Sequence, residues 1–117
     1  MLFICYPGCS TCKKAQAFLD EHKAEYTIRN IKTERPTALE LADWQAKSGL
    51  PLKRFFNTSG LVYKNLGMKE KLGGMTNEEQ LELLAQDGML VKRPILVADD
   101  FVLVGFRLAE WQKALEL

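Results

Sequence analysis

The stretch that decides the fold is Leu2–Lys14, which reads LFICYPGCSTCKK. It opens with a short apolar run that predicts a buried β-strand, and a Pro-Gly pair ends that strand. Cys9 and Cys12 follow as a Cys-x-x-Cys pair, and a helical pattern begins at about Ser10. The face of this helix carries Ala15, Phe18, Leu19 and His22. The sequence therefore places a cysteine pair where a strand gives way to a helix.

The start of a helix is a favourable place for a thiolate. The first turn has unpaired backbone N–H groups and the positive end of the helix dipole, and Lys13 and Lys14 add positive charge nearby. We therefore predict that Cys9 has a lowered pKa and is the nucleophile. Cys12 lies one turn further along, where it can resolve a mixed disulfide.

Two other interpretations of the cysteine pair compete with this one. A structural zinc site needs four ligands, and beyond the pair the chain offers only Cys5 on the strand and His22 on the helix. We therefore predict no metal site, and we expect Cys5 to be a core residue without a catalytic part. The pair could also be small, half-buried residues with no redox role. The strand–turn–helix context is the one that the redox interpretation predicts.

The composition is that of an ordinary globular protein. The 117 residues are 47% hydrophobic and 26% charged, with a net charge of +1, and we expect one domain over residues 1–117. The charge gives no sign of a nucleic-acid or membrane surface. No apolar run approaches the ~20 residues of a membrane span, and the first residues lack a signal-peptide pattern. Three cysteines with one close pair do not resemble a secreted disulfide framework, so we expect a cytoplasmic protein.

Strand patterns occur towards both ends of the chain. Residues 25–31 predict a second strand, parallel to the first through a right-handed crossover. Residues 93–98 and 101–105 predict an antiparallel hairpin. Residues 108–117 predict a closing helix with Leu108, Trp111 and Leu115 on one face.

The middle of the chain predicts helices. Capping boxes at 37–40 and 76–79 begin two of them, which end near Gly49 and Gly88. Residues 50–74 mix apolar residues with glycines and predict only short helical pieces. We therefore predict an α/β fold, a thioredoxin-like mixed sheet of about four strands with a helical insertion between its βαβ and ββα halves.

In thioredoxin-like folds a cis-proline begins the strand that faces the cysteines, and Pro94 is the candidate. Proline lacks an N–H and can leave the sheet edge open beside the sulfurs. The alternative is an ordinary trans proline at the start of a strand.

With these residues in view, the chain resembles the ArsC/Spx family, the arsenate reductases of the glutaredoxin-coupled type and their relatives. The resemblance covers nearly the full length. Its motifs are YPGCSTCKKA at 6–15, RNI at 29–31, FFNTSG at 55–60, YKNLG at 63–67 and KRPILV at 92–97.

The resemblance implies a nucleophile, Cys9, in an anion-binding loop that includes Ser10 and Thr11. It implies that Arg93 and Arg107 hold an oxyanion, although surface ion pairing or packing of their stems is the alternative for both. 

The chain departs from the arsenate reductases at three positions. Asn57 stands where they have a third arginine, and Cys5 stands where they have a histidine. Both changes weaken an arsenate site, because fewer fixed cations pair with a doubly charged anion. Cys12 stands where they have a serine, which matches the Spx branch instead. Yet a glycine of the Spx contact with RNA polymerase falls on Pro51.

Two functions follow from this pattern. The first is an arsenate reductase-like thiol–disulfide oxidoreductase that uses Cys9 and Cys12. It needs no bound cofactor and takes reducing equivalents from a thioredoxin, a glutaredoxin or a low-mass thiol, and its other partner is an oxidised thiol substrate. The second is an Spx-like redox-sensing regulator that binds RNA polymerase, without direct nucleic-acid binding and without a membrane partner. The near-neutral charge and Pro51 favour the first.

Overall fold

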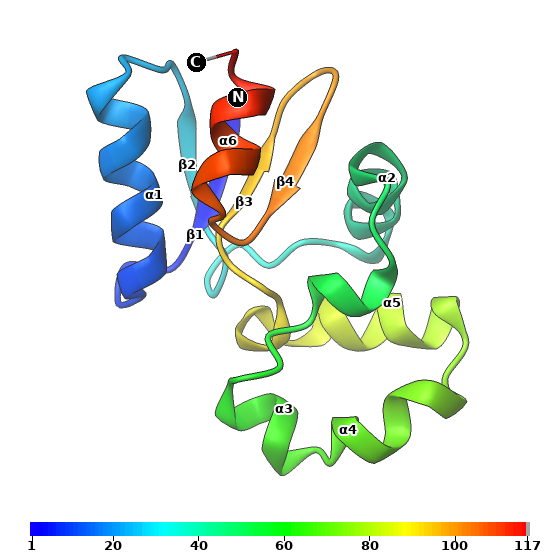
Figure 1. The fold of residues 1–117 in the computed structure, drawn as a ribbon. Helices are drawn as coiled ribbons and strands as arrows, with labels where there is room; N and C mark the ends of the chain where they lie inside the picture. Colours follow the sequence, from blue (N-terminus) through cyan, green and yellow to red (C-terminus); the bar gives the residue numbers. More distant parts are fainter. Residues whose placement is uncertain (117) are drawn as a thin grey trace.

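A four-stranded mixed sheet with the order β2-β1-β3-β4 forms the upper half of the protein in Figure 1. The computed structural model describes residues 1–116. Strand β1 (Leu2–Cys5) runs parallel to β2 (Thr27–Asn30) and antiparallel to β3 (Ile95–Val97). Strand β4 (Val102–Val104) completes the hairpin with β3. The predicted α/β fold with a mixed sheet is confirmed.

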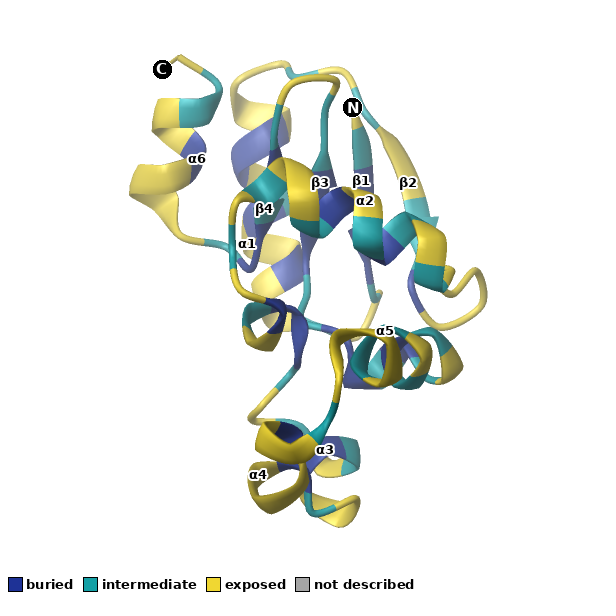
Figure 2. Ribbon diagram, turned by 90° about the vertical axis from the view of Figure 1, so that its right-hand side faces the viewer, coloured by how far each residue is buried: buried dark blue, intermediate teal, exposed yellow. Residues whose placement is uncertain are grey.

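Two helices cover one face of the sheet, α1 (Ser10–Glu21) and α6 (Leu108–Ala114). Because side chains alternate along a strand, Phe3 and Leu96 join the buried residues of α1 and α6, whereas Ile4 and Ile95 join a second cluster on the other face. In Figure 2, buried segments lie along β1 and β3 and on one side of α1.

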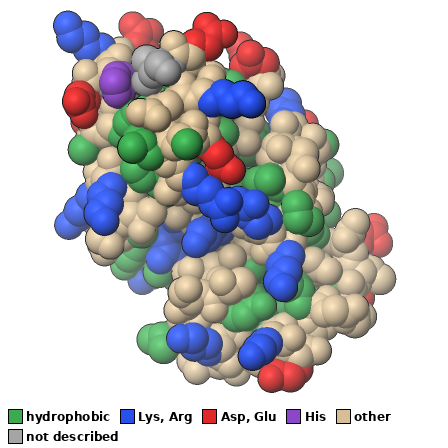
Figure 3. Space-filling view, viewed as in Figure 1, with side chains coloured by type: hydrophobic (Ala, Val, Ile, Leu, Met, Phe, Trp, Pro, Cys, Tyr) green, Lys and Arg blue, Asp and Glu red, His purple; other side chains and the backbone are tan. Residues whose placement is uncertain are grey.

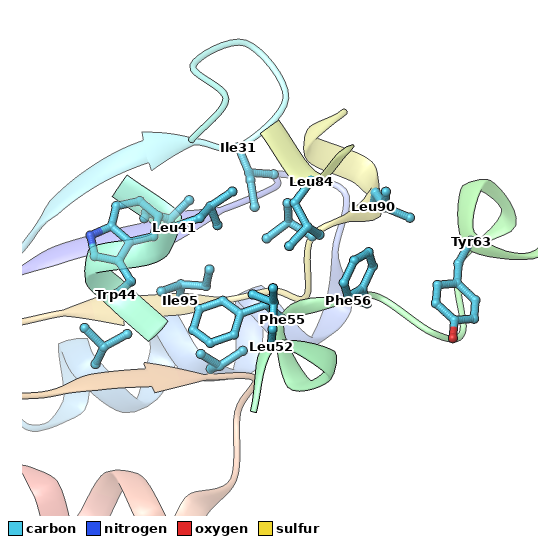
Figure 4. Packing of buried hydrophobic residues seen from close by; sticks show 14 of the residues in the cluster. Ile31, Leu41, Trp44, Leu52, Phe55, Phe56, Tyr63, Leu84, Leu90 and Ile95 are labelled. Atoms are coloured by element: carbon cyan, nitrogen blue, oxygen red, sulfur yellow. The ribbon is translucent and has the colours of Figure 1, made fainter. Parts of the chain in front are cut away.

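Helix α2 (Ala38–Ser48) packs against the second face of the sheet, and the rest of the insertion continues from it. Its elements are η1 (Leu52–Phe55), α3 (Leu61–Asn65), α4 (Met68–Lys71), η2 (Leu72–Gly74), α5 (Asn77–Gln86) and η3 (Gly88–Leu90). Both predicted capping boxes are formed, at Thr37–Glu40 and Thr76–Glu79. Figure 4 shows how Phe55 and Phe56 carry the apolar core from the sheet into the insertion.

One ion pair ties the sheet to α2. The guanidinium of Arg29 on β2 donates to both carboxylate oxygens of Glu40, at 2.6 and 2.8 Å. These bonds hold the pKa of Glu40 at about 2. The same carboxylate accepts from the Thr37 N–H in the capping box, so Arg29 fixes both the start and the orientation of α2.

Several element bounds differ from the sequence predictions. Strand β2 ends early because the Asn30 side chain accepts from the N–H groups of Lys32 and Thr33, which turns the chain. Ile28 is 52% exposed because β2 is an edge strand.

The apolar faces of two helices are also narrower than predicted. His22 is exposed because it follows the last residue of α1. Leu108 is 50% exposed because it is the first residue of α6, and Trp111 anchors that helix instead. The indole N–H of Trp111 donates to the Gly105 carbonyl at 3.0 Å. Leu117, the end of the predicted closing helix, lies outside the described residues.

Over residues 1–116, no helix is long and apolar enough to cross a membrane.

Candidate active site

Cys9 lies at the N-cap of α1, where a tight turn delivers the chain from β1 into the helix. The Cys9 N–H donates to the Tyr6 carbonyl at 3.0 Å, which closes the turn, and the Cys9 carbonyl accepts from the Lys13 N–H at 3.1 Å, which begins the helix. Gly8 lets the turn pass close to Tyr6, since an added Cβ would lie 3.0 Å from that ring. The predicted helix start at about Ser10 is confirmed.

The two thiols of the pair differ in burial. Cys9 is half-buried, whereas Cys12 is 3% exposed and faces the core between α1 and the sheet. The Tyr6 N–H donates to the Cys12 Sγ at 3.4 Å. Burial, together with the neighbouring charge on Cys9, raises the pKa of Cys12 to about 12, so Cys12 is a thiol at neutral pH.

The pKa of Cys9 shifts in the opposite direction, below its ordinary value. Partial burial raises the pKa of its thiol, but the Cys12 N–H, the Cys12 thiol and the Arg93 guanidinium outweigh burial and leave the pKa below its ordinary value. The cationic contribution comes from Arg93, whereas the sequence assigned it to Lys13 and Lys14. Those two lysines lie exposed on the outer side of α1.

Arg93 lies near the cysteine turn because Ile95 pairs with Ile4, so the residues before β3 run beside those that follow β1. The Arg93–Pro94 peptide bond is cis, as expected for Pro94. The guanidinium carbon of Arg93 lies 5.6 Å from the centre of the Tyr6 ring, a cation–π contact. Within residues 1–116, Nε and Nη1 of Arg93 are buried and lack a hydrogen-bond partner. Such donors favour an anionic acceptor beside Cys9.

Arg107 lies between β4 and α6. It is exposed at the N-cap of α6 and lies 3.8 Å from Glu110. It lines a cavity of about 660 Å³ together with Thr11. Ser10, the first residue of α1, is exposed. Arg93 thus acts on the Cys9 thiol, whereas Arg107 lies on the cavity wall with Thr11.

Most of the cationic side chains that line this cavity were not predicted as site residues from the sequence. Lys53, Arg54 and Lys92 line it with Arg107. Figure 3 shows Lys and Arg side chains gathered near the middle of this face, between the sheet region and the insertion. A Lys-Arg pair at 53–54 was the available signal, but nothing in its local pattern connects it to the cysteine loop. We call this group of four cations and its walls the basic cavity.

Asn57 and Cys5 are two of the three departures from the reductase pattern. The Asn57 amide packs against Gly60, and its neighbours Phe56 and Thr58 line the basic cavity. Cys5 is 7% exposed in the same apolar cluster as Cys12. Burial, followed by the charge on Cys9, raises the pKa of Cys5.

All three cysteines are free thiols in the structure. Among the described residues, no group of three or more His, Cys, Asp or Glu side chains is arranged to hold a metal ion.

Comparison with known proteins identifies the relatives of this chain. The sequence model described as the ArsC family matches residues 5–114. The uncharacterized protein YusI of Bacillus subtilis is 50% identical over 107 residues, which is 92% of this chain and 91% of that protein. The regulatory protein MgsR of B. subtilis is 31% identical over 113 residues, 97% of this chain and 88% of that protein. A crystal structure of an ArsC family related protein from Bacteroides fragilis superposes with a TM-score of 0.94 at 56% identity, covering 96% and 94% of the two chains.

Proposed function

We propose that this chain, which belongs to the ArsC family, is a thiol–disulfide oxidoreductase. The observation that carries the proposal is the opposite shift of two neighbouring thiols. The pKa of Cys9 is lowered and that of Cys12 is raised to about 12 at the start of one helix. The Cys9 sulfur is thereby available to attack as a thiolate, whereas Cys12 stays protonated until the second step.

The proposed reaction has two steps. The Cys9 thiolate attacks one sulfur of a disulfide, which forms a mixed disulfide with Cys9 and expels the other half as a thiolate. Cys12 then loses its proton and attacks the Cys9 sulfur, which forms the Cys9–Cys12 disulfide and releases the second half as a thiol. The protein has given two electrons to the substrate, and a thioredoxin, a glutaredoxin or a low-mass thiol returns them.

The negative charge on Cys9 determines which of these two steps comes first. The Cys9 thiolate is one of the groups that raise the pKa of Cys12. Once Cys9 is in a mixed disulfide, that charge is gone, and Cys12 ionises more readily. Cys12 is thus activated by the first step, while Arg93 stabilises negative charge at Cys9 before it.

A direct test couples the protein to NADPH through thioredoxin and thioredoxin reductase, with bis(2-hydroxyethyl) disulfide as substrate. We expect turnover that Cys9→Ser abolishes. We expect Cys12→Ser to accumulate the mixed disulfide on Cys9, seen as an adduct in intact-protein mass spectrometry. Absence of both turnover and adduct, also with a glutaredoxin system, would overturn the proposal.

A second function is supported by the similarity to MgsR, which is named a regulatory protein. In this alternative, the Cys9–Cys12 disulfide switches binding to RNA polymerase. One binding experiment distinguishes the two functions: reduced and oxidised protein are each mixed with purified RNA polymerase. Redox-dependent binding without disulfide turnover would favour the regulator.

A further inference from the structure

The basic cavity lies between the insertion and the turn that joins β4 to α6. Its walls come from η1 on one side and from residues 104–107 on the other. It contains the side chains of Lys53, Arg54, Lys92 and Arg107. All 11 lining residues fall in the described part of the chain, and none of them is acidic. The whole chain has a net charge of only +1, so this is a local concentration of cations.

Intramolecular ion pairs do little to neutralise these cations. Across residues 1–116, the ion pairs join Arg29 to Glu40, Lys47 to Asp43 and Arg107 to Glu110. Only the last involves the cavity. It spans 3.8 Å between exposed side chains, a geometry that contributes little. The cavity therefore keeps a positive potential that favours an anionic ligand.

The cavity adjoins the redox pair. Thr11 on its wall is in the first turn of α1, two residues after Cys9. Phe106, also on the wall, packs on the same apolar cluster as Cys9. Lys92 immediately precedes Arg93. The aliphatic part of the Lys92 side chain lies 3.2 Å from where a Cβ added at Gly105 would be. A ligand in the cavity would thus lie beside the turn that presents the Cys9 sulfur.

The size of the cavity selects among anions. Its volume of about 660 Å³ is within the range of sites that hold organic ligands, roughly 300–1,000 Å³. A tetrahedral oxyanion would occupy a small part of it. Lysines and arginines at several points of the wall suit carboxylate groups carried on an organic framework.

We propose that the basic cavity binds the carboxylate groups of an anionic low-mass disulfide and thereby directs its sulfur to Cys9. This inference rests on the proposed function and names its substrate class. Cys9 attacks the nearer sulfur of the bound disulfide, and a carboxylate-bearing thiolate leaves. Cys12 then displaces the other half as a thiol, so that two electrons pass from the protein to one disulfide.

A series of three similar disulfides tests the charge requirement. The probes are dianionic 3,3′-dithiodipropionate, neutral bis(2-hydroxyethyl) disulfide and dicationic cystamine. Reduced protein is mixed with each probe, quenched with acid, and analysed for the Cys9–Cys12 disulfide by mass spectrometry. Each rate is divided by the rate of the same probe with free dithiothreitol, which removes differences in intrinsic reactivity. We expect the dianion to exceed the neutral probe by roughly tenfold, as one hydrogen bond to a charged group would give, with cystamine slowest.

The variants Lys53→Gln/Arg54→Gln and Lys64→Gln/Lys71→Gln form a matched pair. Both remove two positive charges, but Lys64 and Lys71 are exposed on α3 and α4, away from the basic cavity. We expect only the first double variant to lower the ratio of dianion rate to neutral rate. Added salt should lower the same ratio in the unmodified protein.

The outcomes distinguish this inference from the function on which it rests. Equal normalised rates for the dianion and the neutral probe would overturn the cavity proposal and leave the oxidoreductase intact. An equal loss of preference in both double variants would also overturn it, because net charge rather than the cavity would then be responsible. Failure of all three probes to oxidise the pair would overturn the proposed function itself.

Discussion

The sheet region and the helical insertion contribute different parts of the candidate site. The junction of β1 and α1 carries Cys9 and Cys12, and the turn before β3 brings Arg93 to them. The insertion contributes Lys53 and Arg54 to the basic cavity. The placement of the two sulfurs thus depends on one short turn, whereas their charged surroundings depend on how two regions pack together.

The largest expected effect tests whether these two regions form one cooperative unit. Gly88 begins η3 at the end of the insertion, and an added Cβ would lie 2.0 Å from the Ile31 carbonyl oxygen, which follows β2. We expect Gly88→Ala to lower the free energy of unfolding by about 3 kcal/mol, because the two backbones must separate. Urea denaturation followed by far-UV circular dichroism measures this change.

Gly73→Ala is the control, because nothing lies within 4 Å of a Cβ added there. Its stability should change by less than about 1 kcal/mol. Equal stability of the Gly73 and Gly88 variants would show that the insertion is not held against the sheet region as described.

The second prediction concerns arsenate and depends on the insertion. A reductase must hold a doubly charged anion against Cys9, and Asn57 stands where the resemblance implies a third arginine. Its amide cannot offer a charged guanidinium fork, which costs on the order of tenfold to a hundredfold in rate. We expect weak arsenate reduction beside retained disulfide reduction, measured by NADPH consumption coupled to thioredoxin and to glutaredoxin.

Asn57→Arg is the matched variant in that assay, and it should raise arsenate turnover without removing disulfide reduction. Robust arsenate turnover by the unmodified protein, lost in Cys9→Ser, would contradict the prediction and make arsenate the preferred substrate.

The third prediction concerns Arg93, which joins the cysteine turn to β3. A thiolate is the reactive form, so a lowered pKa keeps Cys9 reactive as the pH falls. We expect Arg93→Gln to raise that pKa and to slow iodoacetamide labelling of Cys9 at pH 6 by roughly tenfold, which corresponds to about one pKa unit. The pH at which labelling is half-maximal should move upward.

Lys13→Gln is the control for Arg93, since it removes an exposed charge from α1. Its labelling profile should match that of the unmodified protein. A larger effect from Lys13 than from Arg93, or faster labelling of Cys12 or Cys5 than of Cys9, would reverse the assignment.

The contrast between Arg93 and Lys13 shows what could be predicted from the sequence. The strand–turn–helix order of Leu2–Lys14 is local, so the positions of Cys9 and Cys12 at the start of α1 could be predicted from it. The strands of the hairpin and the two capping boxes were also local patterns. The cis bond before Pro94 agreed with an expectation taken from fold order.

The basic cavity could not be predicted in that way. Its walls come from residues 11, 51, 53, 54, 56, 58, 92 and 104–107, which only the folded chain brings together. Lys53 and Arg54 lie on η1, whose Leu52 and Phe55 are buried, so their outward direction is set by packing rather than by a periodic pattern. The charge near Cys9 was assigned to its sequence neighbours for the same reason, although Arg93 is the cation that reaches it.

The smallest expected effect lies within the sheet region and concerns Cys5. This thiol is buried beside Cys12 in one apolar cluster, and burial raises its pKa. We therefore expect Cys5→Ala to lower the free energy of unfolding by only about 1 kcal/mol, the effect of a small cavity, and to leave formation of the Cys9–Cys12 disulfide unchanged.

Cys12→Ala is the matched variant, because it creates a similar cavity in the same cluster but removes the resolving thiol. Denaturation should show similar losses for the two, whereas acid-quenched mass spectrometry after a disulfide pulse should show the internal disulfide only in Cys5→Ala. If Cys5→Ala also failed to form that disulfide while remaining folded, Cys5 would belong to the redox chemistry, and the division between one attacking and one resolving thiol would have to include a third sulfur.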